Sequence, residues 1–306
     1  MKVTVTGATG YIGQFVVEYL LKCGDSVHAT TRHRESAEAN WNHARLKWYE
    51  WNLDDPNARF DFLSGTECLV HAAFDHVPGR YRGGEGEDPR GFIERNTIGS
   101  LRLFQSAASL GIKRVVFISS RAVFGETSPE NLVEPIADNQ PTFPDTLYGI
   151  VKSTVEQIAS KETALEFCAI RPTGAYGVIK PIEKSKWFDL CRGNLDDESE
   201  GSNDYIAKTE VHGEDIAKAI RLLLGATKSE IDQQFFNCSD VALSPVQLKY
   251  LVNLVRSGTD HKTAVNSLPL AKKPHHEMSS LGLEKLGWKK SGMQKVVETI
   301  AELVGD

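Results

Sequence analysis

The sequence predicts an α/β fold in which a doubly wound parallel sheet is joined to a smaller C-terminal lobe. Three observations lead to this prediction. Strand-like and helix-like segments alternate over the first 240 residues, a glycine-rich turn follows the first strand, and after about residue 240 helical segments follow one another with little strand between them. A chain of 306 residues is long enough to form one large domain and a second, smaller unit.

The individual elements follow from the spacing of apolar residues. Short runs rich in β-branched and aromatic residues predict strands at 2–6, 26–31, 45–51, 68–73, 114–119, 165–170 and 233–238. Apolar residues at helical spacing predict helices at 11–23, 91–110, 148–161 and 213–224, and then at 244–256, 278–286 and 292–304. Alternation of this kind predicts a mostly parallel sheet with helices on both faces.

Composition excludes several classes of partner. The chain has 41% hydrophobic and 25% charged residues, as ordinary globular proteins do, and its net charge of −6 provides no positive field for nucleic acid or acidic membranes. The five cysteines are far apart and form no CxxC pair, so we expect no metal site. No stretch resembles a signal peptide or a membrane helix, so we expect a cytoplasmic protein.

The first strand runs directly into the sequence TGATGYIG, which spaces Gly7, Gly10 and Gly13 three residues apart. In a strand–turn–helix context, the first glycine permits the sharp turn, the second lets the backbone approach a pyrophosphate, and the third lets the helix pack on the strand. A tight turn without a ligand is the alternative, but a turn alone needs only one glycine. The motif predicts a Rossmann-type dinucleotide site.

The end of the second strand bears on the choice of cofactor. An NAD site has an acidic residue there for the ribose 2′-hydroxyl, whereas an NADP site omits the acid and supplies arginine. This chain has Thr31 at that place, followed by Arg32 and Arg34, so NADP is favoured and NAD remains possible. The alternative is that both arginines are merely solvated.

Three residues form a candidate proton-transfer set. Ser120 follows the fifth strand, at the edge of an open α/β sheet where ligands bind. Tyr148 and Lys152, in the word YGIVK, share one face of a predicted helix. A nearby ammonium favours the phenolate, so Tyr148 can exchange a proton with a substrate hydroxyl while Ser120 holds the same oxygen. Lys152 is also free to bind the nicotinamide ribose.

A second word, YGVIK at Tyr176–Lys180, has the same tyrosine-to-lysine spacing. Glycine and proline residues surround it, and Pro181 disfavours a helical Lys180, so a helix there is not expected. In an extended chain the two side chains stand about 13 Å apart, too far for strong coupling. We therefore predict that the first word carries the chemistry.

Seven segments together resemble the extended short-chain dehydrogenase/reductases, a family that includes nucleotide-sugar epimerases and dehydratases. In order they are TGATGYIG, LVHAAF, NTIGS, SSRAVFG, YGIVK, RPTGAYG and VHGEDIAKAI. The resemblance extends from residue 1 to about 240. It implies a Ser/Tyr/Lys set at Ser120, Tyr148 and Lys152, and a homodimer formed through the helices at 91–110 and 148–161.

The resemblance also implies where a dinucleotide binds and how the chain divides. Residues 1–172 and 209–240 are expected to form the Rossmann domain, and residues 173–208 and 241–306 the substrate-binding lobe. The expected cofactor contacts are Gly7, Thr9, Gly10, Tyr11, Ile12, Gly13, Arg32, Arg34, Asn52, Leu53, His71, Ala72, Ala73, Lys152, Pro172 and Thr173.

Three departures from the family pattern limit the choice of substrate. The adenine contact falls to Asn52 or Asp54, because the third strand is followed by WNLDD. Lys208 stands where nucleotide-sugar enzymes often have an arginine that binds the diphosphate. Arg121 and Ala122 replace the acidic pair of dehydratases, so dehydration is disfavoured.

Two further segments have two interpretations each. The glycine-rich segment at 75–91 is expected to be a loop, and with Arg80 or Arg82 it is placed to cover the substrate. Asn96 is either an ordinary polar helix residue or a member of the proton relay.

We therefore predict an NAD(P)-dependent oxidoreductase that moves hydride between the cofactor and a secondary alcohol or ketone, with sugars and sugar derivatives among the candidate substrates. One alternative is a nucleotide-sugar epimerase that oxidises its substrate transiently with tightly bound NAD. The other is a non-catalytic regulatory protein that senses NADP.

Overall fold

The computed structural model describes residues 1–77, 80, 83–125, 135–162, 164–193, 205–272 and 277–305, without the side chain of His261. Its centre is a seven-stranded sheet of order β3-β2-β1-β4-β5-β6-β9, in which all neighbouring strands are parallel. The strands are β1 (Lys2–Thr6), β2 (Ser26–Thr31), β3 (Leu46–Glu50), β4 (Cys68–His71), β5 (Arg114–Ile118), β6 (Glu166–Pro172) and β9 (Gln234–Cys238). This order confirms the predicted doubly wound sheet.

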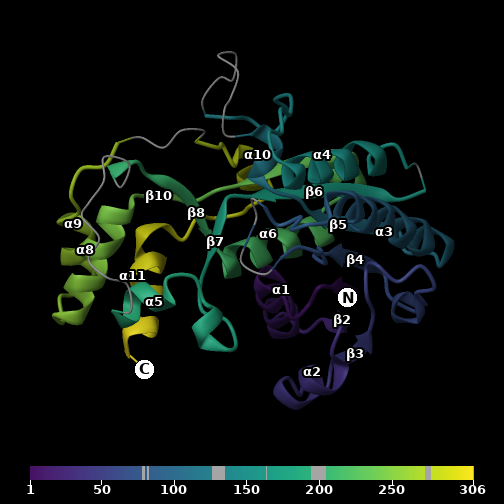
Figure 1. Cartoon of the computed structure of the whole chain (residues 1–306), viewed down its shortest axis with the longest axis horizontal. Helices are drawn as coiled ribbons and strands as arrows, with labels where there is room; N and C mark the ends of the chain where they lie inside the picture. Colours follow the sequence, from purple (N-terminus) through teal and green to yellow (C-terminus); the bar gives the residue numbers. More distant parts are fainter. Residues whose placement is uncertain are drawn as a thin grey trace.

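Helices cover both faces of this sheet (Figure 1). Helices α1 (Tyr11–Lys22) and α6 (Gly213–Gly225) pack against each other on one face, and α3 (Pro89–Ser109) and α4 (Leu147–Ala159) pack against each other on the other face. The shorter elements around the sheet are α2 (Arg34–Asn40), α7 (Lys228–Ile231), α10 (Leu281–Lys285) and the 3₁₀ turns η1 (Asp61–Leu63) and η2 (Arg121–Phe124).

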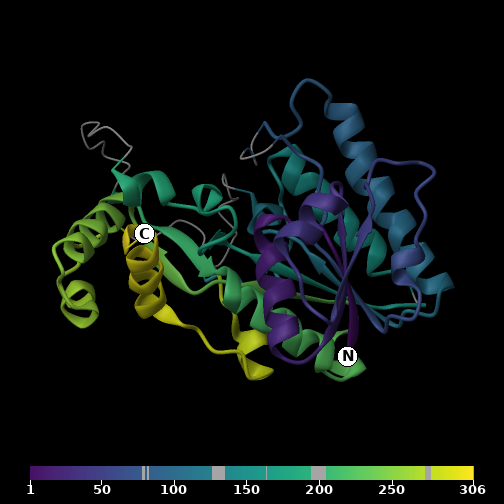
Figure 2. The same cartoon turned by 90° about the horizontal axis from the view of Figure 1, so that it is seen from below.

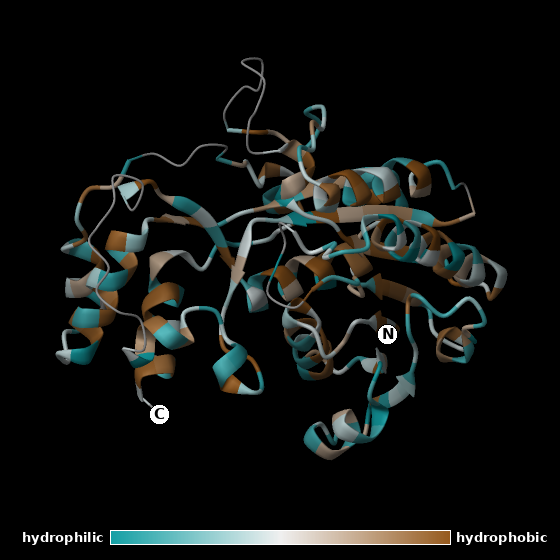
Figure 3. Ribbon diagram, viewed as in Figure 1, coloured by the Kyte–Doolittle hydropathy of each residue, from teal (hydrophilic) through white to brown (hydrophobic). Residues whose placement is uncertain are grey.

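The period-two alternation of side chains explains why each strand is apolar throughout. On β5, Val116 packs into the cluster that includes α1 and α6, whereas its neighbours Val115 and Phe117 pack into the cluster that includes α3 and α4. A strand that is buried on both faces needs apolar side chains at nearly every position. The hydropathy colouring in Figure 3 shows this brown centre, with helices that turn hydrophilic residues outward.

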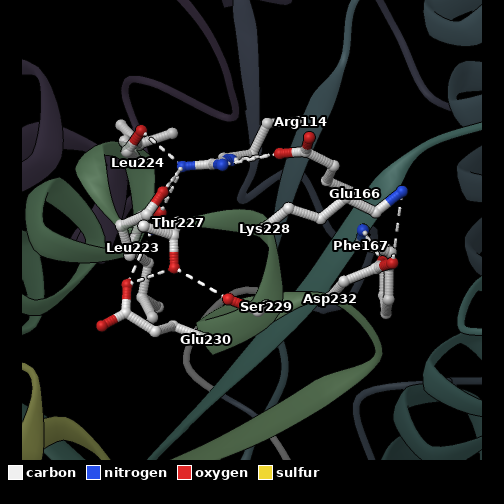
Figure 4. Close-up of polar contacts among 11 residues, drawn as sticks. Arg114, Glu166, Phe167, Leu223, Leu224, Thr227, Lys228, Ser229, Glu230 and Asp232 are labelled. Carbon is white, nitrogen blue, oxygen red and sulfur yellow. Dashed lines mark hydrogen bonds and ion pairs between the residues drawn. The ribbon is translucent and has the colours of Figure 1, made fainter.

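Hydrogen bonds from Arg114 attach the C-terminal end of α6 to the sheet (Figure 4). The Arg114 guanidinium, at the start of β5, donates to the carbonyl oxygens of Leu223 (3.1 Å) and Leu224 (2.8 Å), and its Nη2 lies 2.6 Å from Glu166 of β6. Helices leave their last carbonyls without partners, so a buried cation at that end satisfies them and complements the helix dipole.

The remaining elements form a smaller unit beside the sheet (Figure 2). A three-stranded sheet joins β7 (Gly174–Tyr176) in parallel and β10 (Val241–Leu243) in antiparallel fashion to β8 (Lys208–His212). With it lie η3 (Ile182–Lys184), α5 (Phe188–Arg192), α8 (Pro245–Arg256), α9 (His261–Asn266) and α11 (Gly292–Gly305). This unit has its own apolar cluster, which includes Tyr176, Leu251 and Ile300.

The seven predicted strands and the long helices are confirmed to within a few residues. Sequence patterns missed the three strands of the small sheet and the short helices α2, α5, α7 and α9, because short elements carry too few residues to show a period. Across the described residues, no helix is both long and apolar enough to cross a membrane.

Candidate active site

Two of the three glycines in the first turn, Gly7 and Gly13, occupy places that have no room for a larger residue. Gly7 has φ +64°, and a Cβ there would lie 2.6 Å from the backbone nitrogen of Ala73. A Cβ on Gly13 would lie 2.1 Å from the Gly7 carbonyl oxygen. Gly10 is the N-cap residue of α1, and no side chain caps that end of the helix. The helix therefore directs its N-terminus at a glycine-lined cradle, which is how α/β proteins hold phosphate groups.

A chain of buried hydrogen bonds supports the glycine turn that follows β1. His71 is fully buried, with Nδ1 2.7 Å from the Thr6 hydroxyl and Nε2 2.9 Å from the Ser100 hydroxyl. Ala73 N–H donates to Thr6 Oγ1 (3.3 Å), and the Ser100 hydroxyl donates to the Asn96 carbonyl (2.5 Å). These directions are mutually consistent when His71 is neutral and carries its proton on Nε2.

The pKa of His71 agrees with this assignment. Burial, and to a lesser extent the positive charge of Lys152, lower the pKa of His71 to about 3. The His71 side chain is enclosed by the protein and, through Thr6, supports the backbone at Ala73. The predicted cofactor contact at His71 can therefore be made only by its backbone.

Helix α4 presents Tyr148 and Lys152 beside the end of β5. A Cβ on Gly149 would lie 2.3 Å from the Ala122 carbonyl oxygen, so this glycine lets the helix pack directly on the turn that follows Ser120. The Ser120 hydroxyl accepts a hydrogen bond from Ala122 N–H (3.1 Å). Sequence reasoning did not single out Gly149, although a glycine within a helix is itself a signal of close packing.

The ammonium of Lys152 is enclosed almost completely. Nζ donates to the Ile118 carbonyl (2.7 Å) and lies 4.2 Å from the ring centre of Phe74 and 4.7 Å from that of Phe117. The Tyr148 ring centre is 5.8 Å away. Burial lowers the pKa of Lys152 to about 7, and the charge of Glu156 opposes this shift. Cation–π contacts offset part of the cost of burying the charge.

Tyr176, the tyrosine of the second word, lies neither on a helix nor, among the described residues, beside a lysine ammonium. Tyr176 ends β7 and is fully buried, its ring stacked on Trp187 (4.7 Å between centres) and edge-on to His212 (5.1 Å). Burial and nearby carboxylates raise the pKa of its phenol. No helix joins Tyr176 to Lys180, which precedes Pro181. The expectation that the second word is not helical is confirmed.

The end of β2 carries no acidic residue. The Thr31 hydroxyl, which is buried, accepts from His33 N–H (3.2 Å), and Arg32 is exposed. Arg34 is the first residue of α2, where it pairs with Glu38 one turn later (2.8 Å). Arg32 is therefore the better placed of the two to meet a cofactor.

Asn52 and Leu53, which follow β3 after Trp51, differ in exposure. Asn52 is exposed, whereas the Leu53 side chain packs into the apolar core and its carbonyl lies against Gly99 of α3. Leu53 can therefore meet a ligand only through its backbone.

The loop that follows β4 is pinned by α3. The Asn96 side chain accepts from Asp75 N–H (2.7 Å) and donates to the carbonyls of Asp75 (2.8 Å) and Phe92 (2.9 Å). Arg95 donates to the Asp75 carboxylate (2.7 Å). Asn96 thus uses its amide to hold the loop, which favours the structural interpretation of this residue. Arg82 lies outside the described residues.

Two buried hydroxyls lie where β5 and β6 end. Among the described residues, neither Ser119 Oγ nor Thr173 Oγ1 has a hydrogen-bond partner. Ser119 N–H donates to the Ile170 carbonyl (2.8 Å), which ties the two strand ends together. An unpaired buried hydroxyl is costly, so these groups and the glycine cradle fit a site that a bound dinucleotide completes.

Fold and site together define an α/β protein of the dinucleotide-binding class. The model of the NAD dependent epimerase/dehydratase family matches residues 3–239. The chain belongs to that family.

Curated relatives are similar over part of their length. The chain is 31% identical over 193 residues to UDP-glucose 4-epimerase of Lacticaseibacillus casei, a match that covers 58% of this chain and 53% of the relative. It is 28% identical over 172 residues to dTDP-6-deoxy-L-talose 4-dehydrogenase (NAD(+)) of Aggregatibacter actinomycetemcomitans, covering 56% and 57%. The chain thus spans about half the length of the curated relatives it matches.

Solved structures share the fold over the whole chain. The UDP-glucose 4-epimerase of Thermotoga maritima, solved with UDP-glucose, matches with a TM-score of 0.76 and 21% identity, covering 100% of this chain and 98% of that one. The UDP-glucuronic acid 4-epimerase of Bacillus cereus, solved with NAD, matches with a TM-score of 0.76 and 17% identity, covering 100% and 99%. At these identities the likeness supports the fold alone.

Proposed function

We propose that this chain is an enzyme that moves hydride between a nicotinamide dinucleotide and a secondary alcohol or ketone of a sugar or sugar derivative. The observation that carries the proposal is the pairing of Tyr148 with the enclosed ammonium of Lys152, one helical turn apart, beside the strand end that leads to Ser120. The family membership and the relatives that act on nucleotide sugars support the same class of reaction.

The cofactor is proposed to lie along the C-terminal edge of the sheet. Its pyrophosphate would be held by the glycine cradle at α1, its adenosine end by Arg32 and Asn52, and its nicotinamide end by Lys152 and the Pro172–Thr173 backbone. When bound, the nicotinamide accepts or supplies the hydride. Among the described residues the buried Thr173 hydroxyl has no hydrogen-bond partner, which supports placing the polar nicotinamide end of the cofactor beside it.

Tyr148 is proposed to move the proton that accompanies the hydride. In the oxidative direction its phenolate takes the proton of the substrate hydroxyl, and in the reductive direction its phenol returns it. The Lys152 ammonium stabilises the phenolate, and Ser120 donates to or accepts from the same substrate oxygen. Tyr176 has no such role in this proposal.

A screen of the purified protein tests the activity. Aldoses, uronates, nucleotide sugars and small ketones are offered with NADPH or NADP, and the absorbance of the reduced cofactor is followed. We expect turnover with at least one sugar compound and its loss in Tyr148→Phe, which keeps cofactor affinity. Equal activity of Tyr148→Phe would overturn the proposal. Cofactor binding without turnover of any compound would favour the regulatory alternative.

An epimerase is the second candidate, because several of the relatives are UDP-glucose 4-epimerases. Epimerisation begins with the same hydride step but returns the hydride to the substrate. The two reactions differ in their products. An oxidoreductase changes the amount of reduced cofactor in solution, whereas an epimerase converts one sugar isomer to another with no net change in the cofactor.

The preference for NADP over NAD is proposed from the end of β2, where an acid is absent and Arg32 is exposed. The family description and the Bacillus cereus structure name NAD, so the preference is tested directly by fluorescence titration with NADPH and NADH. We expect tighter binding of NADPH and a loss of that preference in Arg32→Ala. Tighter binding of NADH to the unaltered protein would reverse the assignment.

We further propose that the chain divides into two domains and that two copies of it form a homodimer. We propose that residues 1–172 and 209–240 form most of the dinucleotide-binding domain and residues 173–208 and 241–306 most of the substrate lobe, with two exceptions. Strand β8 belongs to the small sheet, and α10 packs on β9 of the large sheet. A homodimer through α3 and α4 is supported by the exposed apolar side chains of Ile98, Ile150 and Ile158 on these helices. Light scattering should give twice the chain mass, and Ile98→Lys should shift it to that of a monomer. The cytoplasmic location stays a prediction.

A further inference from the structure

One face of the small sheet looks toward the start of α1. On that face the register pairs Gly174 with Glu210 and Tyr176 with His212. The His212 ring packs edge-on against Phe15 of α1, with 5.5 Å between the centres. Glu210 is the acidic residue on this face, and its partner Gly174 begins β7, which continues from β6 after Thr173.

The Glu210 carboxylate rests on the backbone of Gly174. A Cβ at that position would lie 2.3 Å from Oε2, so a glycine is required for the carboxylate to take this place. The Glu210 side chain is only 8% exposed, and its partner Lys186 is 35% exposed, with 2.5 Å between Nζ and Oε2. The Lys186 ammonium is therefore the solvent-accessible member of the ion pair, and the buried Glu210 carboxylate fixes its position.

The backbone of Lys186 is tied to the proposed cofactor turn. Its N–H donates to the Tyr11 hydroxyl (3.0 Å), which in turn donates to the Gly177 carbonyl (2.8 Å). Tyr11 is the first residue of α1, directly after Gly10. Lys186 is consequently fixed at two points, by the residue that opens α1 and by the carboxylate over Gly174.

Charges of both signs lie near Glu210. The cations Lys186, Lys208 and Arg121 act on its carboxylate, and Asp240 lies beside it, with its N–H on the Glu210 carbonyl (3.1 Å). Arg121 directly follows Ser120, so one of these cations belongs to the strand end where the reaction is proposed. Burial raises the pKa of Glu210 and the cations lower it. Lys186, which is partly exposed, and Arg121 are therefore the cations available to an anionic group near that strand end.

We infer that Lys186, positioned by Glu210 and Tyr11 and assisted by Arg121, binds an anionic oxygen group of the substrate close to the carbon that exchanges hydride. The substrate class is then a sugar that bears a carboxylate or a phosphate, since both offer oxygens that an ammonium and a guanidinium bind. This inference rests on the proposed function, because it takes the strand end at Ser120 as the place where the substrate reacts.

Calorimetry with matched sugar probes tests the inference. D-glucuronate and D-glucose 6-phosphate are titrated into the NADPH-loaded protein beside neutral D-glucose. We expect the better anionic probe to bind about tenfold more tightly than D-glucose, and Lys186→Met to remove that advantage while changing the Kd of D-glucose by less than about twofold. Whichever anionic probe binds more tightly identifies the carboxylate or the phosphate as the source.

Three further variants keep the result interpretable. Lys186→Arg should retain the advantage of the anionic probe. The double variant Lys186→Met/Glu210→Gln should lose it without leaving an unpaired buried carboxylate. Lys184→Met, which removes an exposed charge two residues away, should bind like the unaltered protein.

The inference is overturned if neither anionic probe binds more tightly than D-glucose, or if the advantage survives in Lys186→Met. NADPH and NADH binding, followed by fluorescence, separates this outcome from a failure of the proposed function. If the unaltered protein binds neither cofactor, the proposed function fails. If it binds a cofactor and shows no anionic preference, only the inference fails.

Discussion

The words YGIVK and YGVIK have nearly the same composition and the same spacing, yet they occupy different environments. Tyr148 and Lys152 lie one turn apart on α4, with the ammonium 5.8 Å from the ring centre of the tyrosine. Tyr176 ends a strand and is packed between Trp187 and His212, while Lys180 is exposed. A five-residue pattern becomes a site only where the backbone places both side chains on one face and at the sheet edge.

Replacing each tyrosine by phenylalanine is the strongest test of this difference. Tyr148→Phe removes the proposed proton carrier and should lower kcat by about a hundredfold to ten-thousandfold. Tyr176→Phe removes a hydroxyl from the other word and should leave kcat within about threefold. Steady-state kinetics on the substrate found in the screen measures both. Similar losses in the two variants would remove the distinction between the words.

The glycine that follows each tyrosine sharpens the contrast. A Cβ on Gly149 would meet the Ala122 carbonyl at 2.3 Å, and one on Gly177 would meet Phe15 at 2.6 Å. Both changes to alanine should destabilise the fold by about 1–3 kcal/mol, as overpacking does. Only Gly149→Ala should also lower kcat, by about tenfold, because it shifts α4 away from Ser120. Denaturant unfolding and kinetics at a permissive temperature separate the two effects, and an unchanged kcat in Gly149→Ala would contradict this role.

The two lysines should differ in what they contribute to stability. Burial lowers the folded-state pKa of Lys152 to about 7 from an ordinary 10.5, so between these pH values the unfolded chain holds a proton that the folded chain has released. Stability therefore rises with pH across this window. Lys152→Met lacks this rise and should be about 1–3 kcal/mol more stable than the unaltered protein near pH 7, with the gap narrowing toward pH 9.5.

Lys180→Met is the matched control for this measurement, because it removes an exposed ammonium from the second word. Its stability should stay within about 0.5 kcal/mol of the unaltered protein at every pH. Urea unfolding at a series of pH values gives both curves. A gap for Lys152→Met that is constant with pH would show that its ammonium is not desolvated in the folded chain.

The smallest expected effect concerns the phenol of Tyr176. Within the described part of the chain its hydroxyl has no hydrogen-bond partner, although it is buried. Removing a buried unpaired polar group relieves its desolvation, so Tyr176→Phe should raise the free energy of unfolding by about 1 kcal/mol. Tyr148→Phe, at a half-buried position, should change it by less than about 0.5 kcal/mol. Loss of stability in Tyr176→Phe would indicate that the hydroxyl has a partner.

Much of the fold could be predicted because its signals are local. Strands buried on both faces must be apolar over their whole length, and long amphipathic helices repeat their pattern often enough to be recognised. The small sheet was missed for the opposite reason. Its strands β7, β8 and β10 have three to five residues each, and their partners lie far apart in the sequence. Pairing of that kind depends on how the rest of the chain folds.

By itself, the sequence determined the glycine turn, the order of strands and helices, and the absence of a helix at the second tyrosine word, because each depends on backbone preferences within a few residues. Only the tertiary structure decided that His71 is a neutral buried support, that Gly149 seats α4 against Ala122, and that Glu210 rests on Gly174 to hold Lys186. These are contacts between segments distant in the chain. Their burial and electrostatics exist only after the segments meet, so no local pattern records them.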